Sequence, residues 1–177
     1  MTEPTKVLNS QQRRYLDAQT QRAREAAQRG AEDAVQALAV GELCRPEFLD
    51  DEQNRLRLAL RDKARQLGDD TTTADAPLTN LVHDIAYEQW HRLLFARFLE
   101  VNDLLRHPEY REIPLSLSDC SDLSSDLGEP DTWAVAARFA SEILPGVFRL
   151  ADPAVQVRFA AEHRNAMEDL LLGALPP

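Results

Sequence analysis

The stretch from residue 78 to residue 106 is rich in large apolar residues, and it constrains the fold more than any other part of the chain. Around Trp90–Leu99 these residues fall on nearly every side of a helix with about 3.6 residues per turn. A helix that is apolar all round is normally buried among other helices. Pro108 disfavours helical backbone at His107, which sets the expected end of this helix. The sequence therefore predicts an all-α fold, an irregular multi-helix bundle around a long central helix at about residues 78–106.

Single Gly and Pro residues and short polar loops separate this helix from several others. The chain has only 6 Gly in 177 residues, and it is rich in Ala, Leu, Gln, Glu and Arg, which favour helix. Val155, Val157 and Phe159 alternate with other residues, which predicts a short extended segment near 155–159. The remaining helices are expected at about residues 10–38, 50–67, 115–127, 131–144 and 160–172.

The first predicted helix differs from the others because it has few large apolar residues. Tyr15, Leu16, Val35 and Leu38 give it only a thin apolar stripe. A helix with such a narrow stripe is peripheral or awaits a partner. We therefore expect residues 1–45 to form a peripheral N-terminal helix and residues 46–177 to form one globular bundle.

The formal net charge is −10, from 20 Lys and Arg residues and 30 Asp and Glu residues. Two segments carry almost all of this imbalance. Residues 68–77 hold three acidic residues and no basic one, and residues 108–131 hold seven acidic residues and one basic residue. Charge runs of this kind are usually solvated loops. The balance also argues against phosphate binding by the surface as a whole.

The chain contains no apolar run near the roughly 20 residues that a membrane-spanning helix needs. Its N-terminal residues lack the apolar core of a secretory signal. Cys44 and Cys120 lie far apart in the sequence, and we expect two free thiols, with a disulfide between them as the alternative. These features predict a cytoplasmic protein without a membrane partner.

The six glycines (Gly30, Gly41, Gly68, Gly128, Gly146 and Gly173) stand alone, and each is expected where a helix ends. Loops that hold nucleotides or methyl donors need clustered glycines, and no GxGxxG, GxxxxGK[ST] or GxSxG motif is present. The neighbouring acids Asp50–Asp51 and Asp69–Asp70 are interpreted as helix caps. The four histidines are scattered, and no Cys/His cluster has zinc spacing. We therefore predict no catalytic, cofactor-binding or metal-binding residue.

Five arginines are candidates for contact with a partner or with DNA. Arg57, Arg61 and Arg65 recur every four residues on one helical face, which is either a solvated face or a phosphate contact. Arg92 and Arg97 lie on the most apolar helix, near Glu88 and Glu100 at helical spacing. Charges there must form pairs inside the bundle or reach a neighbouring domain or a DNA phosphate.

Residues 86–105, AYEQWHRLLFARFLEVNDLL, combine aromatic residues and Arg with an acidic-Asn-x-Leu-Leu ending. This pattern resembles a helical segment found early in bacterial DNA adenine methyltransferases of the BREX and DISARM phage-defence systems. Two later matches resemble that region in the same order, so the likeness covers about residues 82–172. The second match is residues 114–123 followed by 133–144, and the third is residues 144–171. The positions that carry the first match are Trp90, His91, Arg92, Phe95, Arg97, Phe98, Glu100, Asn102, Leu104 and Leu105.

The resemblance implies a restriction-modification setting and N6-adenine methylation with S-adenosylmethionine. In that family a glycine-rich loop and an Asn/Asp-Pro-Pro-aromatic motif receive the donor and the flipped adenine. Asp152–Pro153–Ala154 lacks the second Pro and the aromatic residue, so no catalytic residue is carried over. S-adenosylmethionine is expected only in a catalytic domain that the chain lacks, and the chain alone is not expected to be an enzyme.

Three interpretations remain open at this point. The first is a non-catalytic helical domain or subunit that positions DNA, the methyltransferase catalytic domain or another defence-system subunit. The second is a stand-alone acidic regulatory protein of a defence complex, whose segment 108–131 covers a basic DNA-binding surface. The third is a small enzyme with an unfamiliar site.

Overall fold

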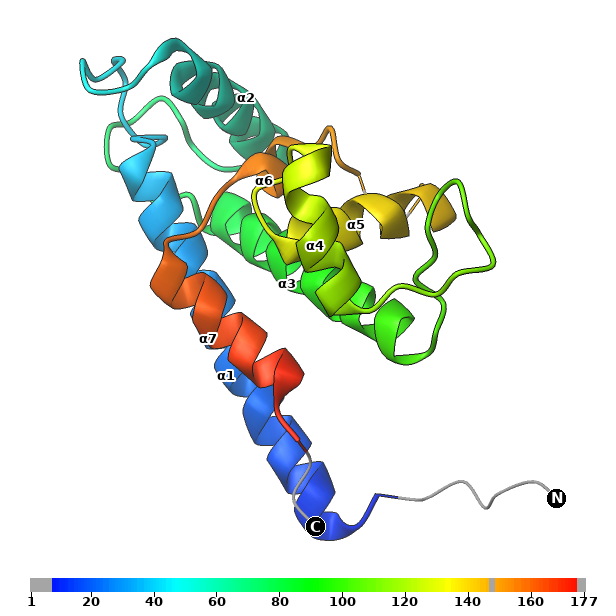
Figure 1. The fold of residues 1–177 in the computed structure, drawn as a ribbon. Coiled ribbons are helices and arrows are strands. Elements are labelled where there is room, and N and C mark those ends of the chain that lie inside the picture. The colour runs from blue at the N-terminus through cyan, green and yellow to red at the C-terminus, as the bar shows by residue number, and fades with distance from the viewer. Residues whose placement is uncertain (1–7, 147–148, 175–177) are drawn as a thin grey trace, which may run out of the picture.

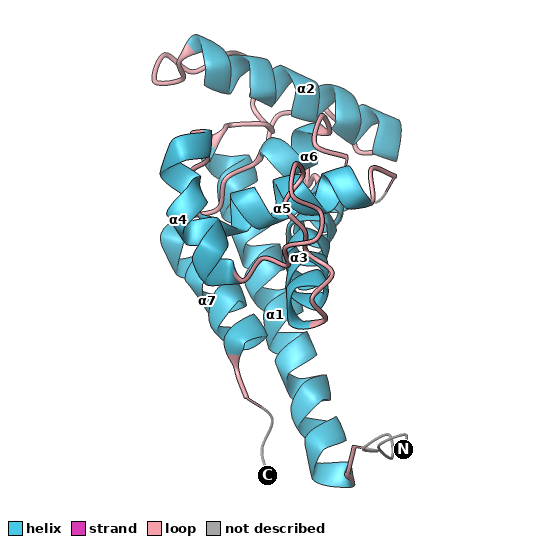
Figure 2. Ribbon diagram, turned by 45° about the vertical axis from the view of Figure 1, so that its right-hand side comes forward, coloured by secondary structure: helices cyan, strands magenta, loops and turns pink. Residues whose placement is uncertain are grey.

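The computed structural model describes residues 8–146 and 149–174, and in these ranges the chain forms α-helices joined by loops (Figure 1). No β-strand occurs in the described ranges; Arg106 and Pro114 form an isolated bridge (Figure 2). The predicted all-α fold is therefore confirmed. Over the same residues, no helix has both the length and the apolarity to cross a bilayer. The helices are α1 (Ser10–Ala37), α2 (Asp51–Leu67), α3 (Thr79–Val101), α4 (Leu117–Leu127), α5 (Thr132–Ile143), α6 (Pro153–Gln156) and α7 (Ala161–Leu172).

Local capping signals explain where most of these helices begin. The residue before each of α1, α2 and α4 forms a capping box with the third residue of the helix, so both backbone N–H groups gain an acceptor. The carboxylate of Asp131 accepts from the Ala134 amide at 2.9 Å and starts α5. Gly68 and Gly128 end α2 and α4 with left-handed backbone (φ 93° and 67°), as a C-terminal glycine does.

Helix α3 is the centre of the bundle, as the sequence predicts. It packs against α1, α2, α5, α6 and α7. Two groups of buried apolar side chains lie along it, one including Leu60 of α2 and Ile85, the other Leu93 and Phe139 of α5. Figure 1 shows α3 enclosed between the α1–α7 pair and the α4–α5 pair.

Helix α3 ends at Val101, five residues before the predicted end. The backbone turns at Asn102 and Asp103, and Asp103 adopts a left-handed conformation (φ 55°) that suits Asp better than most residues. This turn sends Leu105 into the core, where it is fully buried and accepts from the Leu115 amide at 2.9 Å. Burial of Leu105 and Leu115 thus decides where the helix stops.

Helix α1 buries small residues rather than the large ones that the sequence analysis singled out. Its buried stripe of Ala and Gly recurs at helical spacing along the second half of the helix, which packs on α3 and α7. Gly30 lies inside this stripe, so the expectation that every glycine ends a helix is wrong at this position. The first turns project beyond the bundle, as Figure 2 shows. The buried residues of α1 are Ala23, Ala26, Ala27, Gly30, Ala31 and Ala34.

The segment after α5 crosses α3 as a single helical turn followed by extended backbone. Asp152 caps α6 and Pro153 takes its first position. Val155 lies within α6, so the extended segment predicted near 155–159 begins only at Val157 (φ −64°, ψ 132°). The buried amide of Gln89 lies 2.9–3.2 Å from the carbonyl oxygens of residues 154, 155 and 157. It therefore supplies the hydrogen bonds that the end of α6 would otherwise lack.

Candidate interaction surface on helix α3

Two of the five candidate arginines hold the end of α1 in place. Arg57 of α2 is 2% exposed, and its guanidinium donates to the carbonyl oxygens of Ala39 (2.9 Å), Glu42 and Cys44 (3.0 Å). Burial, the largest effect, and the charge of Arg61 lower the pKa of Arg57. Arg57 therefore lies on the buried face of α2 rather than on a solvated one.

Arg61 completes the same arrangement. Its guanidinium donates to the carbonyl oxygens of Val40 (2.5 Å), Glu42 (2.7 Å) and Thr71 (2.6 Å). Arg57 and Arg61 thus supply donors to backbone carbonyl groups of the loop after α1, which lies outside regular secondary structure. Arg65 is separate from them, since it is exposed and pairs with Asp62.

The other two candidates, on α3, have different partners. Arg97 pairs with Glu100 one turn later, so the predicted ion pair forms, with both side chains half-buried rather than inside the bundle. Arg92 does not pair with Glu88 in the predicted way: it donates to Gln89 Oε1 (3.2 Å) and to a backbone carbonyl (3.4 Å). Burial lowers the pKa of Arg92, although Asp131, Glu88 and Glu129 partly oppose this effect.

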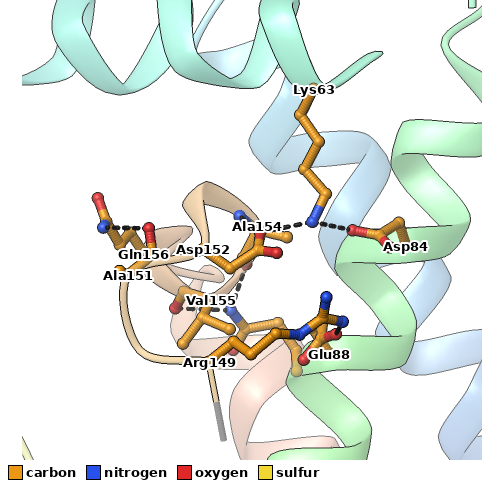
Figure 3. Close-up of polar contacts among 10 residues, drawn as sticks. Lys63, Asp84, Glu88, Arg149, Ala151, Asp152, Ala154, Val155 and Gln156 are labelled. Carbon is orange, nitrogen blue, oxygen red and sulfur yellow. Dashed lines mark hydrogen bonds and ion pairs between the residues drawn. The ribbon is translucent and has the colours of Figure 1, made fainter. Parts of the chain in front are cut away.

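Glu88 pairs instead with Arg149, at 2.9 Å, beside a second ionic contact (Figure 3). There Lys63 of α2 lies 2.7 Å from Asp84 of α3 and 2.5 Å from Asp152 at the start of α6. Lys63, Asp84, Arg149 and Asp152 line a cavity of about 320 Å³. Each charged group is engaged by an opposite charge from another element, so the cluster ties α2, α3 and α6 together.

The pKa shifts agree with this structural role. Burial alone would lower the pKa of Lys63, but hydrogen bonds to Asp152 and Asp84 outweigh it and raise the pKa. Burial would raise the pKa of Asp152, but the bonds from Lys63 and the Ala154 amide lower it. Both groups are therefore held in their charged forms at neutral pH, where neither acts readily as an acid or a base.

The outer side of α3, next to Asp84 and Glu88, carries a continuous row of aromatic rings, which we call the aromatic ladder: Tyr87, His91, Phe95 and Phe98. Tyr87 stacks on His91 with ring centroids 5.2 Å apart and planes at 9°. His91 and Phe95 follow at 5.5 Å, and Phe95 and Phe98 at 5.8 Å, both in tilted contact. The spacing of these residues, four, four and three, keeps them on one face of the helix.

The ladder lies in a strip of large apolar side chains that the bundle leaves uncovered. Tyr87 is 60% exposed, Phe98 51%, Leu94 44% and Val101 55%. The ladder together with Leu94 and Val101 is called the ladder face below. Scattered apolar residues are normal at a surface, but a contiguous apolar strip usually marks an interaction site. The ladder face is therefore the candidate functional site.

Acidic segments precede and follow α3 in the sequence. At the start of α3, the Asp69 carboxylate accepts from the amides of Asn80 (3.1 Å) and Leu81 (2.8 Å), which confirms its predicted capping role. Hydrogen bonds from the Thr72 side chain and backbone lower the pKa of Asp70 to about 2. At the other end, α3 runs into the loop that opens the acidic segment 108–131.

Sequence reasoning located this surface only in part. It found the apolar helix and named Trp90–Leu99 as apolar on nearly every side, but it assigned the whole helix to the interior. The signal that separates the two faces is the aromatic spacing of Tyr87, His91, Phe95 and Phe98, since the buried face carries Leu81, Ile85 and other residues of the core.

Comparisons with protein-family models, with curated proteins and with solved structures give no match to this chain.

Proposed function

We propose that this chain is a non-catalytic helical module of a bacterial DNA adenine methyltransferase of the phage-defence type. Its role is to bind the catalytic domain or another subunit of that system through the ladder face. The exposure of the ladder face is the observation that carries the proposal. The resemblance described above supplies the enzyme class.

The stretch that carries the resemblance is also the stretch that forms the ladder face. Some of its residues have evident internal roles: Arg97 pairs with Glu100, and Leu105 enters the core. Phe98 and Leu104 do not, because about half of each side chain is exposed. Phe98 contacts Phe95 along one edge, but its exposed half has no contact within the bundle, and a partner on this face would cover it.

The polar groups support a binding role over a catalytic one. Lys63, Asp152, Arg149 and Glu88 are used in contacts between helices. The two glycines with positive φ, among the described residues, are Gly68 and Gly128, and both end helices rather than forming a loop that holds a methyl donor. We accordingly propose that the donor and the flipped adenine bind elsewhere in the assembled enzyme.

The test is complex formation with a separately expressed catalytic region of a methyltransferase of this family. We expect a one-to-one complex by light scattering after gel filtration, and weaker binding by the Leu94→Ser and Phe98→Ser variants in calorimetry. Leu58→Ser and Phe48→Ser are matched controls, since these residues are similarly exposed (49% and 71%) but belong to α2 and the loop before it rather than to α3. Absence of a complex, or equal effects of both variant pairs, would contradict the proposal.

A second experiment addresses the cofactor. The isolated chain should show no heat of binding with S-adenosylmethionine and should transfer no methyl group to DNA. Micromolar binding of S-adenosylmethionine to this chain would overturn its assignment as a non-catalytic module.

The alternative function is a stand-alone acidic regulator that covers a basic DNA-binding surface. The observation that favours it is the row of exposed acids Asp119, Asp122 and Asp126 on one face of α4. Asp119 is held in the capping box, where hydrogen bonds from Ser116 lower its pKa. A regulator of this kind competes with DNA for its target, and Asp122→Asn with Asp126→Asn weakens that competition. The Leu94→Ser and Phe98→Ser variants would leave the competition with DNA unchanged.

A further inference from the structure

We propose that Asp33 of α1, together with Glu162 and His163 of α7, forms a binding site for a divalent transition-metal ion such as Zn²⁺. The bound ion joins α1 to α7. The ladder face lies on α3, so this inference goes beyond the proposed function and does not depend on it. It is drawn from the convergence of three ligand atoms that two different helices supply.

The three side chains bring their ligand atoms close together between α1 and α7. His163 Nε2 lies 2.6 Å from Asp33 Oδ2 and 3.4 Å from Glu162 Oε1. One ligand atom of each residue lies within 4.8 Å of those of the other two. The ligands of a tetrahedral Zn²⁺ ion, each at about 2.0–2.1 Å from it, are about 3.3 Å apart. Small rotations of the side chains therefore bring all three atoms to coordination distance.

Helix packing, rather than a loop, fixes this arrangement. Helix α7 runs beside α1, as Figure 1 shows, and the contact of Gly30 with Phe159 brings the chain close to α1 just before His163. The His163 side chain is only 13% exposed, whereas those of Asp33 and Glu162 are 59% and 77% exposed. The imidazole thus forms the inner wall of the site, and the carboxylate side is open to solvent, which gives an ion a path of entry.

The two carboxylates have no cationic partner apart from the histidine. Among the described residues, His163 alone lies within ion-pair distance of Asp33 or Glu162. The neighbouring Arg164 lies instead 3.5 Å from Asp131. Nε2 of His163 carries at most one proton, which suits the nearer Asp33 and leaves Glu162 without a close partner. A metal ion accepts a lone pair from each of the three groups and so satisfies both carboxylates.

The ligand set selects the class of ion. Imidazole nitrogen suits Zn²⁺ and its transition-metal neighbours, whereas Mg²⁺ and Ca²⁺ prefer sites made of oxygen ligands. Three protein ligands leave one position of a tetrahedral ion to water, so we expect weaker binding than at a closed site with four protein ligands. Sequence spacing does not predict this site, because Asp33 and His163 lie 130 positions apart.

Calorimetric titration of the full chain tests the inference. The chain is treated with a chelator, dialysed and titrated with ZnCl2 at pH 7.5, and with MgCl2 in parallel. We expect one Zn²⁺ per chain, bound at least tenfold more tightly than Mg²⁺. Asp33→Asn should weaken Zn²⁺ binding at least tenfold, since it removes the charge of a ligand and keeps its shape, and His163→Gln should abolish binding.

Control variants separate loss of the site from loss of the fold and from binding elsewhere. Asp33 is exposed, so Asp33→Asn keeps the fold even where substitution of the largely buried His163 disturbs it, and circular dichroism checks both variants. His83→Gln and Cys44→Ser remove an exposed imidazole and an exposed thiol outside the site. Both controls should bind Zn²⁺ as the unmodified chain does.

Thermal unfolding gives a second readout, because an ion that bridges two helices binds the folded chain more tightly than the unfolded chain. Zn²⁺ at about 100 times its Kd should raise Tm by about 5 °C or more, and this increase should vanish in Asp33→Asn. Absence of both Zn²⁺ binding and a Tm increase would mean that the three side chains form an ion pair only, and would overturn the inference. Equal binding of Mg²⁺, or loss of Zn²⁺ binding in a control variant but not in Asp33→Asn, would overturn it as well.

Discussion

Gly30 of α1 lies directly against the ring of Phe159, in the segment that leads into α7. A Cβ atom added at Gly30 would stand 2.5 Å from Cδ2 of that ring, closer than atoms pack. Phe159 contacts both groups of buried side chains along α3, so its ring has little room to move. The absence of one methyl group at residue 30 thus sets how closely α1 approaches the segment between α6 and α7.

We predict that Gly30→Ala destabilises the protein even though Ala favours helix over Gly by about 1 kcal/mol. Overpacking a core typically costs about 1–3 kcal/mol, and the ring leaves little relief, so after the gain in helix propensity we expect a net loss of up to about 2 kcal/mol in urea denaturation. Phe159→Leu should restore part of this loss in the double variant. Gly41→Ala is the control, because a Cβ there meets nothing within 4 Å. An increase in stability for Gly30→Ala would show that the ring can move aside.

This contact shows which parts of the fold the sequence predicts and which it does not. Helix starts at Asn9, Asp50 and Ser116 depend on residues three positions apart, so local patterns locate them well. The packing of Gly30 on Phe159 joins residues 129 positions apart, and no local pattern predicts it. For the same reason a scale that weights large apolar residues overlooks the alanine face of α1.

The candidate site follows the same rule. Spacing alone places Arg57, Arg61 and Arg65 on one face. It does not show that Arg57 and Arg61 donate hydrogen bonds to the carbonyl groups after α1. The apolar character of α3 is evident in the sequence, whereas its exposed side depends on which faces α1, α5 and α7 cover. When a helix is apolar on all sides, hydrophobic periodicity cannot show which face is buried and which is exposed.

We predict that Arg57→Met lowers the free energy of unfolding by about 1–3 kcal/mol, because it removes the hydrogen bonds of a buried guanidinium to three carbonyl groups. The carbonyls of Ala39 and Glu42 keep a second donor, the Glu42 amide and Arg61. The side chain of Met has a similar length and keeps the apolar contacts of the Arg stem. Arg65→Met on the same helix is the control, with an expected change within about 0.5 kcal/mol because Arg65 is exposed. Urea denaturation measures both. Similar stabilities for the two variants would contradict the role assigned to Arg57.

The two free cysteines should react at very different rates with a thiol reagent such as Ellman's reagent. Cys44 is exposed, whereas Cys120 is fully buried in the core beside α3. Burial first, and then the charges of Asp119 and Glu100, raise the pKa of Cys120 to about 11, so little thiolate forms at pH 8. We expect one thiol to react rapidly in the native protein and two in guanidinium chloride. In Cys44→Ser the rapid phase should disappear, and a rapid phase that persists would place Cys120 at the surface.

The contact of Lys63 with Asp84 and Asp152 predicts a stability difference that depends on pH. Lys63→Met should lower the free energy of unfolding at pH 7 by about 1–3 kcal/mol, less than the roughly 3–5 kcal/mol for a fully buried pair because these side chains keep some contact with solvent. The pKa of Asp152 is lowered in the folded state, so its contribution is present above the ordinary carboxyl pKa of about 4 and is lost as the pH falls through the lower folded value.

The pKa of Lys63 is raised in the folded state, so its contribution is complete below the ordinary lysine pKa of about 10.4 and is lost as the pH rises through the folded value. The stability difference between the native protein and Lys63→Met should therefore be largest between about pH 5 and pH 10 and should shrink on both sides. Urea denaturation at pH 2.5, 7 and 11.5 measures it, with Arg65→Met as the exposed control. A difference that stays constant over this range would mean that Lys63 stabilises the helices by the packing of its alkyl chain and not by its charge, because only the charge depends on protonation.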